Sequence, residues 1–299
     1  MQSKRLFTFG CSYTQYTYPT WADFLGLEFT QFENWGMAGI GCKAIAERVA
    51  ECHARNTITK DDIVIVQWST HLRHDFYTPA PILGRKENWK TMGSVFSVEN
   101  KPLYDKKWID TFFFEPGYIM HCLNHILMIQ TMLESIGCTW YMTSIGDWTK
   151  LSSDLDLSTA AWEKRLDVEE YSIENHYPEF KFYLKPIWED RANHWLRPIA
   201  LEALDNPDDW FWFHPEGEHQ WREQHPSCQQ YVIWLNKHLR PKLRLGDPPK
   251  EQQQWIDQIN KVKQDCKDDR NQMTYRFRHK QETFDYWPSS VWPRNFEGF

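Results

Sequence analysis

The sequence predicts an α/β protein in which helices cover both faces of a mostly parallel sheet. Two short runs predict buried strands, a largely apolar one at 5–9 and a wholly apolar one at 63–66. Parallel strands that are covered on both faces have this pattern, because neither side meets water. Segments with helical spacing, at 43–56 and 117–137, follow them. Strands that alternate with helices in this way indicate a parallel sheet.

In the first quarter of the chain each element has its own signal. A helix is expected at 19–25, because Pro19 lies near its first turn and Gly26 directly follows its last residue. A short second strand is expected at 28–33. The helix at 43–56 is expected to bury one face, formed by Ala44, Ile45, Val49 and Cys52.

Later elements are separated by two long irregular stretches. Residues 78–110 are rich in Pro, Gly, Asn and Lys, which predicts a long insertion over the mouth of the ligand crevice. The helix at 117–137 is closed by Gly137, and a fourth strand is expected at 139–145. An amphipathic helix is expected at 226–239, with its apolar side facing the core.

The domain organisation follows from these signals. We expect one domain at 1–240, with insertions at about 76–115 and 147–223, and a C-terminal extension at 241–299 that starts near a Gly-Asp-Pro-Pro hinge. The extension should hold a polar helix and then an arm, residues 271–299, that is rich in aromatic side chains. Disordered tails are poor in such residues. The arm is therefore expected either to wrap its own domain or to dock on a protein partner or a second copy.

Composition excludes several classes of partner. The chain has 299 residues and a net charge of −7, with no long basic run, so nucleic acid is not expected as a partner. No apolar stretch is long enough to span a membrane, and no secretory signal opens the chain. Seven cysteines without a CxxC pair indicate a reducing compartment. We expect a protein of the cytoplasm that needs no cofactor.

Ser12 is the first candidate for chemistry. It lies just beyond the first predicted strand and its Gly10, at the edge where open α/β sheets bind ligands. The alternative is a serine that only caps the following helix. Cys11 is a second candidate nucleophile, but alternation along a strand points neighbouring residues to different sides. We therefore favour Ser12 as the nucleophile and Cys11 as a packing residue.

Two further blocks accompany Ser12, namely Asn34-Trp35-Gly36-Met37-Ala38-Gly39 and His225-Pro226-Ser227. In order and spacing the three blocks resemble those of SGNH, or GDSL-like, hydrolases, over about residues 5–75 and 220–240. The resemblance is closest to the divergent SGNH-like proteins that tailed phages of cyanobacteria encode. It implies a flavodoxin-like three-layer α/β/α fold with a mostly parallel sheet, extended here by insertions and a C-terminal extension.

The resemblance also implies a role for each residue. Ser12 would be the nucleophile, His225 its base and Glu223 the acid that orients the imidazole. The family commonly has its acid three residues before the histidine, where this chain has Arg222. The backbone amides of Ser12 and Gly39 would hold the oxyanion. The family's third donor is an asparagine, and Thr70 occupies that place here, with His71 beside it as a substitute donor.

Other charged groups have competing interpretations. Arg73 and Asp75 could bind a substrate carboxylate or phosphate, or form a surface ion pair. The segment 214–225 holds three His and three Glu, but its spacing matches no helical zinc motif, so we expect solvated charges and no metal.

Three functions compete at this stage. The first is a serine esterase or acyl hydrolase that acts on a small-molecule or glycan ester, with O-acyl groups of carbohydrates as the expected class. The second is a phage virion structural or adaptor protein that keeps a degenerate SGNH fold and uses residues 271–299 for assembly. It would be made in the host cytoplasm and incorporated in the virion, and the missing asparagine favours it. The third is a carbohydrate-binding module that uses the tryptophans of 195–221 as stacking platforms.

Overall fold

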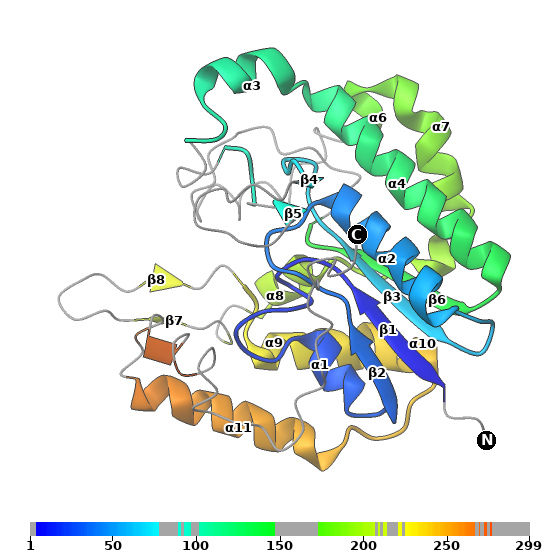
Figure 1. Ribbon diagram of the computed structural model, residues 1–299. Helices are drawn as coiled ribbons and strands as arrows, with labels where there is room; N and C mark the ends of the chain where they lie inside the picture. Colours follow the sequence, from blue (N-terminus) through cyan, green and yellow to red (C-terminus); the bar gives the residue numbers. More distant parts are fainter. Residues whose placement is uncertain are drawn as a thin grey trace.

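The centre of the molecule is a four-stranded parallel sheet (Figure 1). The computed structural model describes residues 4–77, 89–90, 93–96, 102–146, 173–206, 209, 212–213, 221–222, 225–266, 269, 272–273 and 276. Its main strands are β1 (Arg5–Phe9), β2 (Gln31–Asn34), β3 (Ile63–Trp68) and β6 (Thr139–Ser144), in the order β2-β1-β3-β6. The expected α/β class with a parallel sheet is therefore confirmed.

Strand β3 is buried at every one of its six positions because it lies between β1 and β6 and helices cover both faces of the sheet. It extends two residues beyond the apolar run, to Gln67 and Trp68, which pair with Thr143 and Ser144. The polar Gln67 interrupts the apolar run, so the last two residues of the strand were not predicted. Strand β2 lies at an edge and begins three residues later than predicted.

Helices cover both faces of the sheet (Figure 1). Helices α2 (Cys42–Asn56) and α4 (Glu115–Ile136) pack together on one face. Helices α1 (Trp21–Gly26) and α9 (Cys228–Trp234) pack together on the other, where α8 (Ile199–Leu204) and α11 (Lys250–Asp265) also contact α9. This arrangement is compatible with three layers. The chain continues from α9 through a π-helical turn, Leu235–Leu239, into α10 (Arg240–Leu243).

Helix ends follow local rules, with one difference from the prediction. Gly137 ends α4 in a left-handed conformation with φ of 75°, as its position predicted. Gly26 is the last residue of α1 and not the residue after it, and a Cβ atom there would collide with the ring of Phe32. That glycine is explained by close packing against β2 and not by helix termination.

The two predicted insertions contain more regular structure than the sequence suggested. Residues 76–115 hold the antiparallel pair β4 (Phe76–Tyr77) and β5 (Trp89–Lys90), and then α3 (Lys106–Phe112). Asp105 caps α3 by accepting a hydrogen bond from the Trp108 amide at 2.7 Å. The prediction of an irregular chain at 78–110 was therefore wrong for residues 89–90 and 106–110.

Short elements make up the described part of 147–223. They are α6 (Ile173–His176), the 3₁₀ turn η3 (Pro178–Phe180), α7 (Lys181–Leu184), the π turn η4 (Lys185–Glu189), the 3₁₀ turn η5 (Ala192–His194), α8, β7 (Trp212–Phe213) and β8 (Trp221–Arg222). Strands β7 and β8 pair antiparallel. None of these elements is long enough to show a clear period in the sequence.

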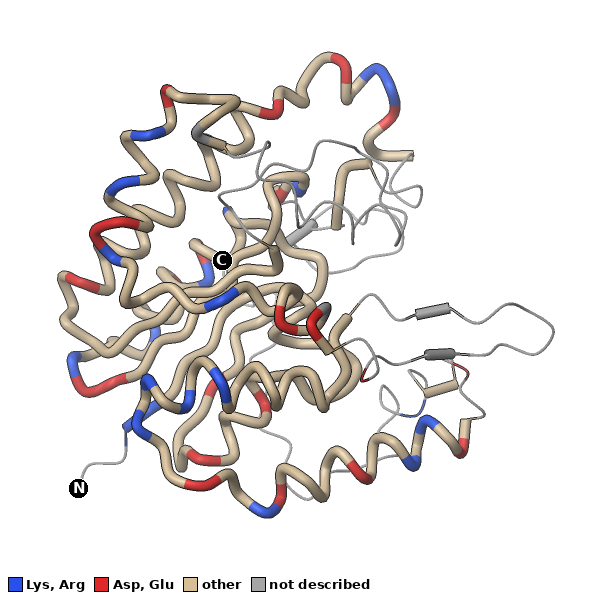
Figure 2. Tube along the Cα trace, turned by 180° about the vertical axis from the view of Figure 1, so that it is seen from behind, with Lys and Arg blue, Asp and Glu red and all other residues tan. Residues whose placement is uncertain are grey.

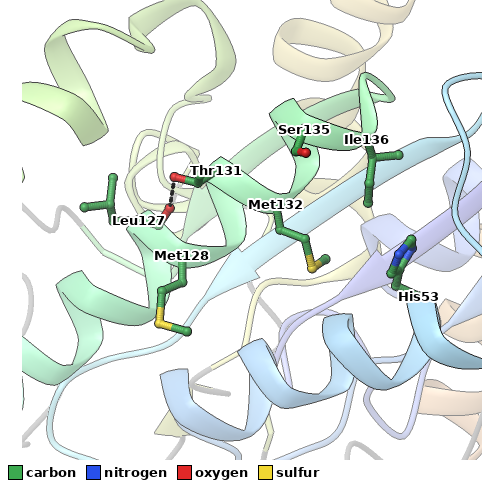
Figure 3. Close-up of a pocket in the computed structure, with 7 residues that line it drawn as sticks. All are labelled: His53, Leu127, Met128, Thr131, Met132, Ser135 and Ile136. Carbon is green, nitrogen blue, oxygen red and sulfur yellow. Dashed lines mark hydrogen bonds between the residues drawn. The ribbon is translucent and has the colours of Figure 1, made fainter.

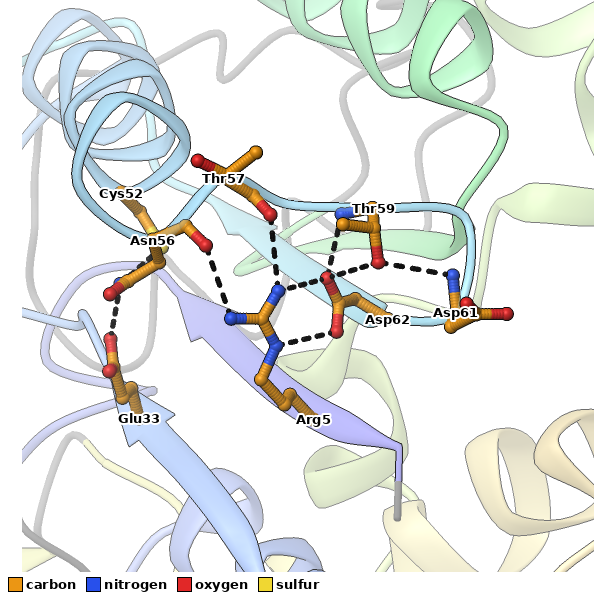
Figure 4. A network of polar contacts seen from close by, with 8 residues as sticks. All are labelled: Arg5, Glu33, Cys52, Asn56, Thr57, Thr59, Asp61 and Asp62. Carbon is orange, nitrogen blue, oxygen red and sulfur yellow. Dashed lines mark hydrogen bonds and ion pairs between the residues drawn. The ribbon is translucent and has the colours of Figure 1, made fainter. Parts of the chain in front are cut away.

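A polar network closes the amino edge of the sheet (Figure 4). Arg5, at the start of β1, donates two hydrogen bonds to the Asp62 carboxylate, at 2.8 and 2.7 Å. It also donates to the carbonyls of Asn56 and Thr57, where α2 ends. Burial raises the pKa of Asp62, but hydrogen bonds from Arg5 and Thr59 outweigh it and leave that pKa below its usual value. This network joins β1, the end of α2 and the start of β3.

Charges of both signs are dispersed over the chain (Figure 2). Helix α11, for example, carries Lys250, Lys261 and Lys263 together with Glu251, Asp257 and Asp265. Among the helices that the structure describes, none combines the length and the apolar character that a membrane crossing requires.

Candidate active site

The carboxyl edge of the sheet brings together the loops that follow β1, β2 and β3. From β1 the chain runs outward to β2 on one side, whereas β3 and β6 lie on the other. Ligands of open α/β sheets bind where the strand order reverses in this way. Ser12 lies three residues beyond β1, and Thr70 lies two residues beyond β3. Both residues therefore flank this switch point.

Ser12 and His225 meet at this edge although 213 residues separate them. The distance between Ser12 Oγ and His225 Nε2 is 2.8 Å. Ser12 is 6% exposed and His225 is half-buried. An imidazole nitrogen at hydrogen-bond distance from a serine hydroxyl is the arrangement in which the imidazole can remove the hydroxyl proton.

The turn that presents Ser12 is held by its neighbours. The Cys11 carbonyl accepts hydrogen bonds from the amides of Thr14 and Gln15, at 2.9 and 3.0 Å. Cys11 is fully buried, and its amide and thiol donate to Gln67 Oε1 on β3, at 3.1 and 3.3 Å. The expectation that Cys11 packs in the core is therefore confirmed.

Asn34 ties the second block to the first. Its Nδ2 donates to the Thr14 carbonyl at 2.9 Å, and its Oδ1 accepts from the Gly36 amide at 2.9 Å. The Met37 amide then donates to the Gly10 carbonyl at 2.9 Å. The loop after β2 thus runs beside the loop after β1.

Asp23, in the first turn of α1, binds the end of the loop after β1 and also Asn34. Its carboxylate accepts hydrogen bonds from the Thr20 amide at 2.8 Å and from Asn34 Nδ2 at 3.3 Å. Burial raises the pKa of Asp23 to about 6, although these hydrogen bonds act to lower it.

Three tyrosines of the loop after β1 surround His225. The Tyr16 ring stacks on the imidazole, with centroids 3.9 Å apart and planes 23° apart. The Tyr13 ring lies tilted against it, at 5.4 Å. Tyr18 donates its hydroxyl to the Pro226 carbonyl at 3.1 Å. These residues were not predicted from the sequence, although three tyrosines within six positions after Ser12 give a signal.

Helix α9 fixes the other side of the histidine loop. Ser227 caps α9 with a capping box. The backbone amide of Gln230 donates to the Ser227 hydroxyl, and the side-chain oxygen of Gln230 accepts from the Ser227 backbone amide. The thiol of Cys228 donates to the Pro19 carbonyl at 3.3 Å. The segment that carries His225 is therefore fixed on its carboxyl-terminal side by the start of α9.

The predicted oxyanion donors lie at the same edge. Gly39 has φ of 87°, and its carbonyl accepts from the Gly93 amide at 3.1 Å. Thr70 Oγ1 accepts from the Leu72 amide at 2.9 Å. A hydroxyl that accepts a hydrogen bond still carries its own proton, so Thr70 keeps the capacity to donate.

Residues 71 to 75 have structural partners. His71 Nε2 lies 3.0 Å from Glu115 Oε1, and this hydrogen bond lowers the pKa of Glu115. Arg73 donates to the Ile40 carbonyl at 2.7 Å. Asp75 accepts from the amides of Gly41 and Ala44 at the start of α2. It is 5% exposed, so the alternative of a surface ion pair is wrong for Asp75.

Some predicted features lie outside the described residues. They include Glu223 and, apart from residues 272–273 and 276, the arm at 271–299. Most of the His- and Glu-rich segment 214–224 lies outside them too. Within the part of the chain that the structure describes, no three His, Cys, Asp or Glu side chains are grouped as ligands of a metal ion.

A pocket of about 640 Å³ opens elsewhere, between the ends of α2 and α4 (Figure 3). It lies toward the amino edge of the sheet and is lined by His53, Leu127, Met128, Thr131, Met132, Ser135 and Ile136. Among these lining residues a hydrogen bond joins Thr131 to the Leu127 carbonyl, and none joins Ser135 to His53. The chemistry of the carboxyl edge is therefore the stronger candidate.

Comparison with known proteins adds no relative: the sequence matches no protein-family model and no curated protein.

Proposed function

We propose that this chain is a serine esterase or acyl hydrolase of SGNH type. One observation carries the proposal, the 2.8 Å separation of Ser12 Oγ and His225 Nε2 at the switch point of the sheet. The two residues lie 213 positions apart, so local chain geometry does not explain their contact. The sheet order β2-β1-β3-β6 supports the finer proposal of a flavodoxin-like fold, in which the first three strands have this order.

The proposed reaction is acyl transfer in two steps. Ser12 Oγ attacks the ester carbonyl while its proton passes to His225 Nε2. The carbon–oxygen bond to the alcohol then breaks, and the same proton moves from His225 to the leaving alkoxide. Water, deprotonated by His225, attacks the acyl-enzyme and releases the acid and free Ser12. Neither of the two proposed steps requires a cofactor.

The oxyanion of each tetrahedral intermediate would be held by the amides of Ser12 and Gly39 and by the hydroxyl of Thr70. A donor of this kind contributes about a hundredfold to a thousandfold in rate. Glu223 is proposed to orient the imidazole, and His71 and Arg73 to contact the substrate. The substrate class that we propose is O-acyl groups of carbohydrates.

Hydrolysis of short-chain p-nitrophenyl esters and of an acetylated-sugar panel tests the proposal. Ser12→Ala and His225→Ala should each lose at least about a thousandfold in kcat/KM. Ser135→Ala and His121→Gln replace an exposed serine and an exposed histidine on α4, and should leave the rate unchanged. Equal rates in wild type and Ser12→Ala would exclude the serine mechanism.

A virion structural or adaptor role is the second candidate. The observation that favours it is the threonine at position 70, where the SGNH family has an asparagine. A folded wild-type protein that hydrolyses none of the esters would support this role and count against the enzyme.

A further inference from the structure

We propose that Tyr16 is a positioning residue for His225, holding the imidazole in the plane from which it takes the Ser12 proton. This role rests on the proposed function of Ser12 and His225. In serine hydrolases a carboxylate holds the catalytic imidazole in its orientation, and here an aromatic ring would share that role.

The contact is a face-to-face stack. The ring centroids of Tyr16 and His225 are 3.9 Å apart and the planes differ by 23°. The outer torsion of a histidine side chain is broad, so contacts must select one ring orientation. Rotation of the imidazole about that torsion would move Nε2 away from Ser12 Oγ. The flat face of Tyr16 opposes this rotation.

Tyr16 is itself held in place. Its ring packs edge-on against Tyr18, at 5.0 Å and 85°. Tyr18 is 2% exposed and its hydroxyl is bonded to the Pro226 carbonyl, one residue from the histidine. The stack is therefore built from both chain segments of the site, the loop after β1 and the segment that carries His225.

The stack also stabilises the positive charge that forms on His225 during the reaction. When Nε2 accepts the serine proton, the imidazole becomes a cation, and the face of an aromatic ring attracts a cation. Tyr13 presents a second ring at 5.4 Å, tilted by 51°. The pair of rings thus favours the charged intermediate of the reaction over the neutral ground state.

Labelling of Ser12 by a fluorophosphonate tests the proposal without knowledge of the natural substrate. In this reaction Ser12 Oγ bonds to phosphorus, the phosphorus–fluorine bond breaks, fluoride leaves and the serine proton passes to His225. Intact mass reports the second-order rate constant for the full chain. Ser12→Ala identifies the labelled residue.

The variants separate the ring from its hydroxyl. Tyr16→Phe keeps the stack and should react within about twofold of wild type, whereas Tyr16→Leu should be about tenfold slower. Tyr141→Leu is the matched control, because Tyr141 is also a partly buried tyrosine packed on the core, and its rate should not change. Equal rates for Tyr16→Leu and wild type would overturn the positioning role and leave the esterase proposal standing.

Two other results have distinct meanings. A folded wild type that is never labelled would refute the serine mechanism, and the role of Tyr16 would fall with it. If Tyr16→Leu does not fold, proton NMR of the wild type decides. A stacked ring shifts the His225 ring protons upfield, relative to the same protons in unfolded protein. Unshifted signals, assigned with His225→Gln, would contradict the stack.

Discussion

Tyr18 and Pro226 are joined by a hydrogen bond of 3.1 Å, from the tyrosine hydroxyl to the proline carbonyl, across 208 residues of sequence. The bond links the loop that carries Ser12 to the segment that carries His225. It is buried, since Tyr18 is 2% exposed. The distance between the proposed nucleophile and base therefore depends on a contact that involves neither side chain.

Removal of this hydrogen bond should destabilise the protein. In Tyr18→Phe the Pro226 carbonyl loses a buried partner, and the free energy of unfolding should fall by about 1–2 kcal/mol. Urea unfolding at neutral pH measures the change. The matched control is Tyr141→Phe, whose hydroxyl donates to the Lys242 carbonyl at 3.3 Å in an exposed contact and whose effect should stay below about 0.5 kcal/mol. Equal losses in the two variants would contradict a special role for the buried bond.

Asp23 should make stability decrease as pH rises. Its pKa of about 6 in the folded protein exceeds the value of about 4 expected in the unfolded chain, so the folded state binds more protons between these values. The contribution is fully present below pH 4 and is lost as pH rises to about 6. Its size, for a shift of about two pKa units, is roughly 3 kcal/mol.

Comparison with Asp23→Asn isolates this effect. The variant removes the titrating group, so the difference in free energy of unfolding between it and the wild type should change between pH 4 and 6 and be flat above about pH 7. Urea titrations at several pH values measure it. The variant's lower absolute stability is expected, because its amide nitrogen would face one of the two donors, either the Thr20 amide or Asn34 Nδ2. A constant difference across this range would show that Asp23 has an ordinary pKa.

Gly10 should not tolerate a side chain. A Cβ atom there would lie 2.7 Å from Gln67 Oε1 and would also collide with Thr14 Oγ1. Gly10→Ala should therefore cost about 1–3 kcal/mol through forced repacking, and it should slow ester hydrolysis because the turn bearing Ser12 must move. Gly246→Ala is the control, since nothing lies within 4 Å of the added atom, and it should change stability by less than about 0.5 kcal/mol. Thermal unfolding of both variants provides the test. Equal losses of stability in Gly10→Ala and Gly246→Ala would show that the turn accommodates a side chain at position 10.

The sequence by itself determined the sheet and its principal helices. The strand at 5–9, the helix that ends at Asn56 and the glycine that closes α4 were predictable, because burial on both faces, helical spacing and a left-handed glycine each leave a local pattern. Ser12 could be singled out for the same reason, since it follows a strand and a glycine within a few residues.

The family resemblance paired Ser12 with His225, but only the tertiary structure decided the distance between them and which other distant groups meet. The 2.8 Å contact of Ser12 with His225, the stack of Tyr16 on that imidazole and the carboxylate of Asp75 at the start of α2 all join residues far apart in the chain. Such contacts leave no periodic trace, because they depend on the order of strands in the sheet and on the crossing of loops at its carboxyl edge. Local sequence patterns specify elements, whereas packing of the whole chain fixes the distances on which a reaction depends.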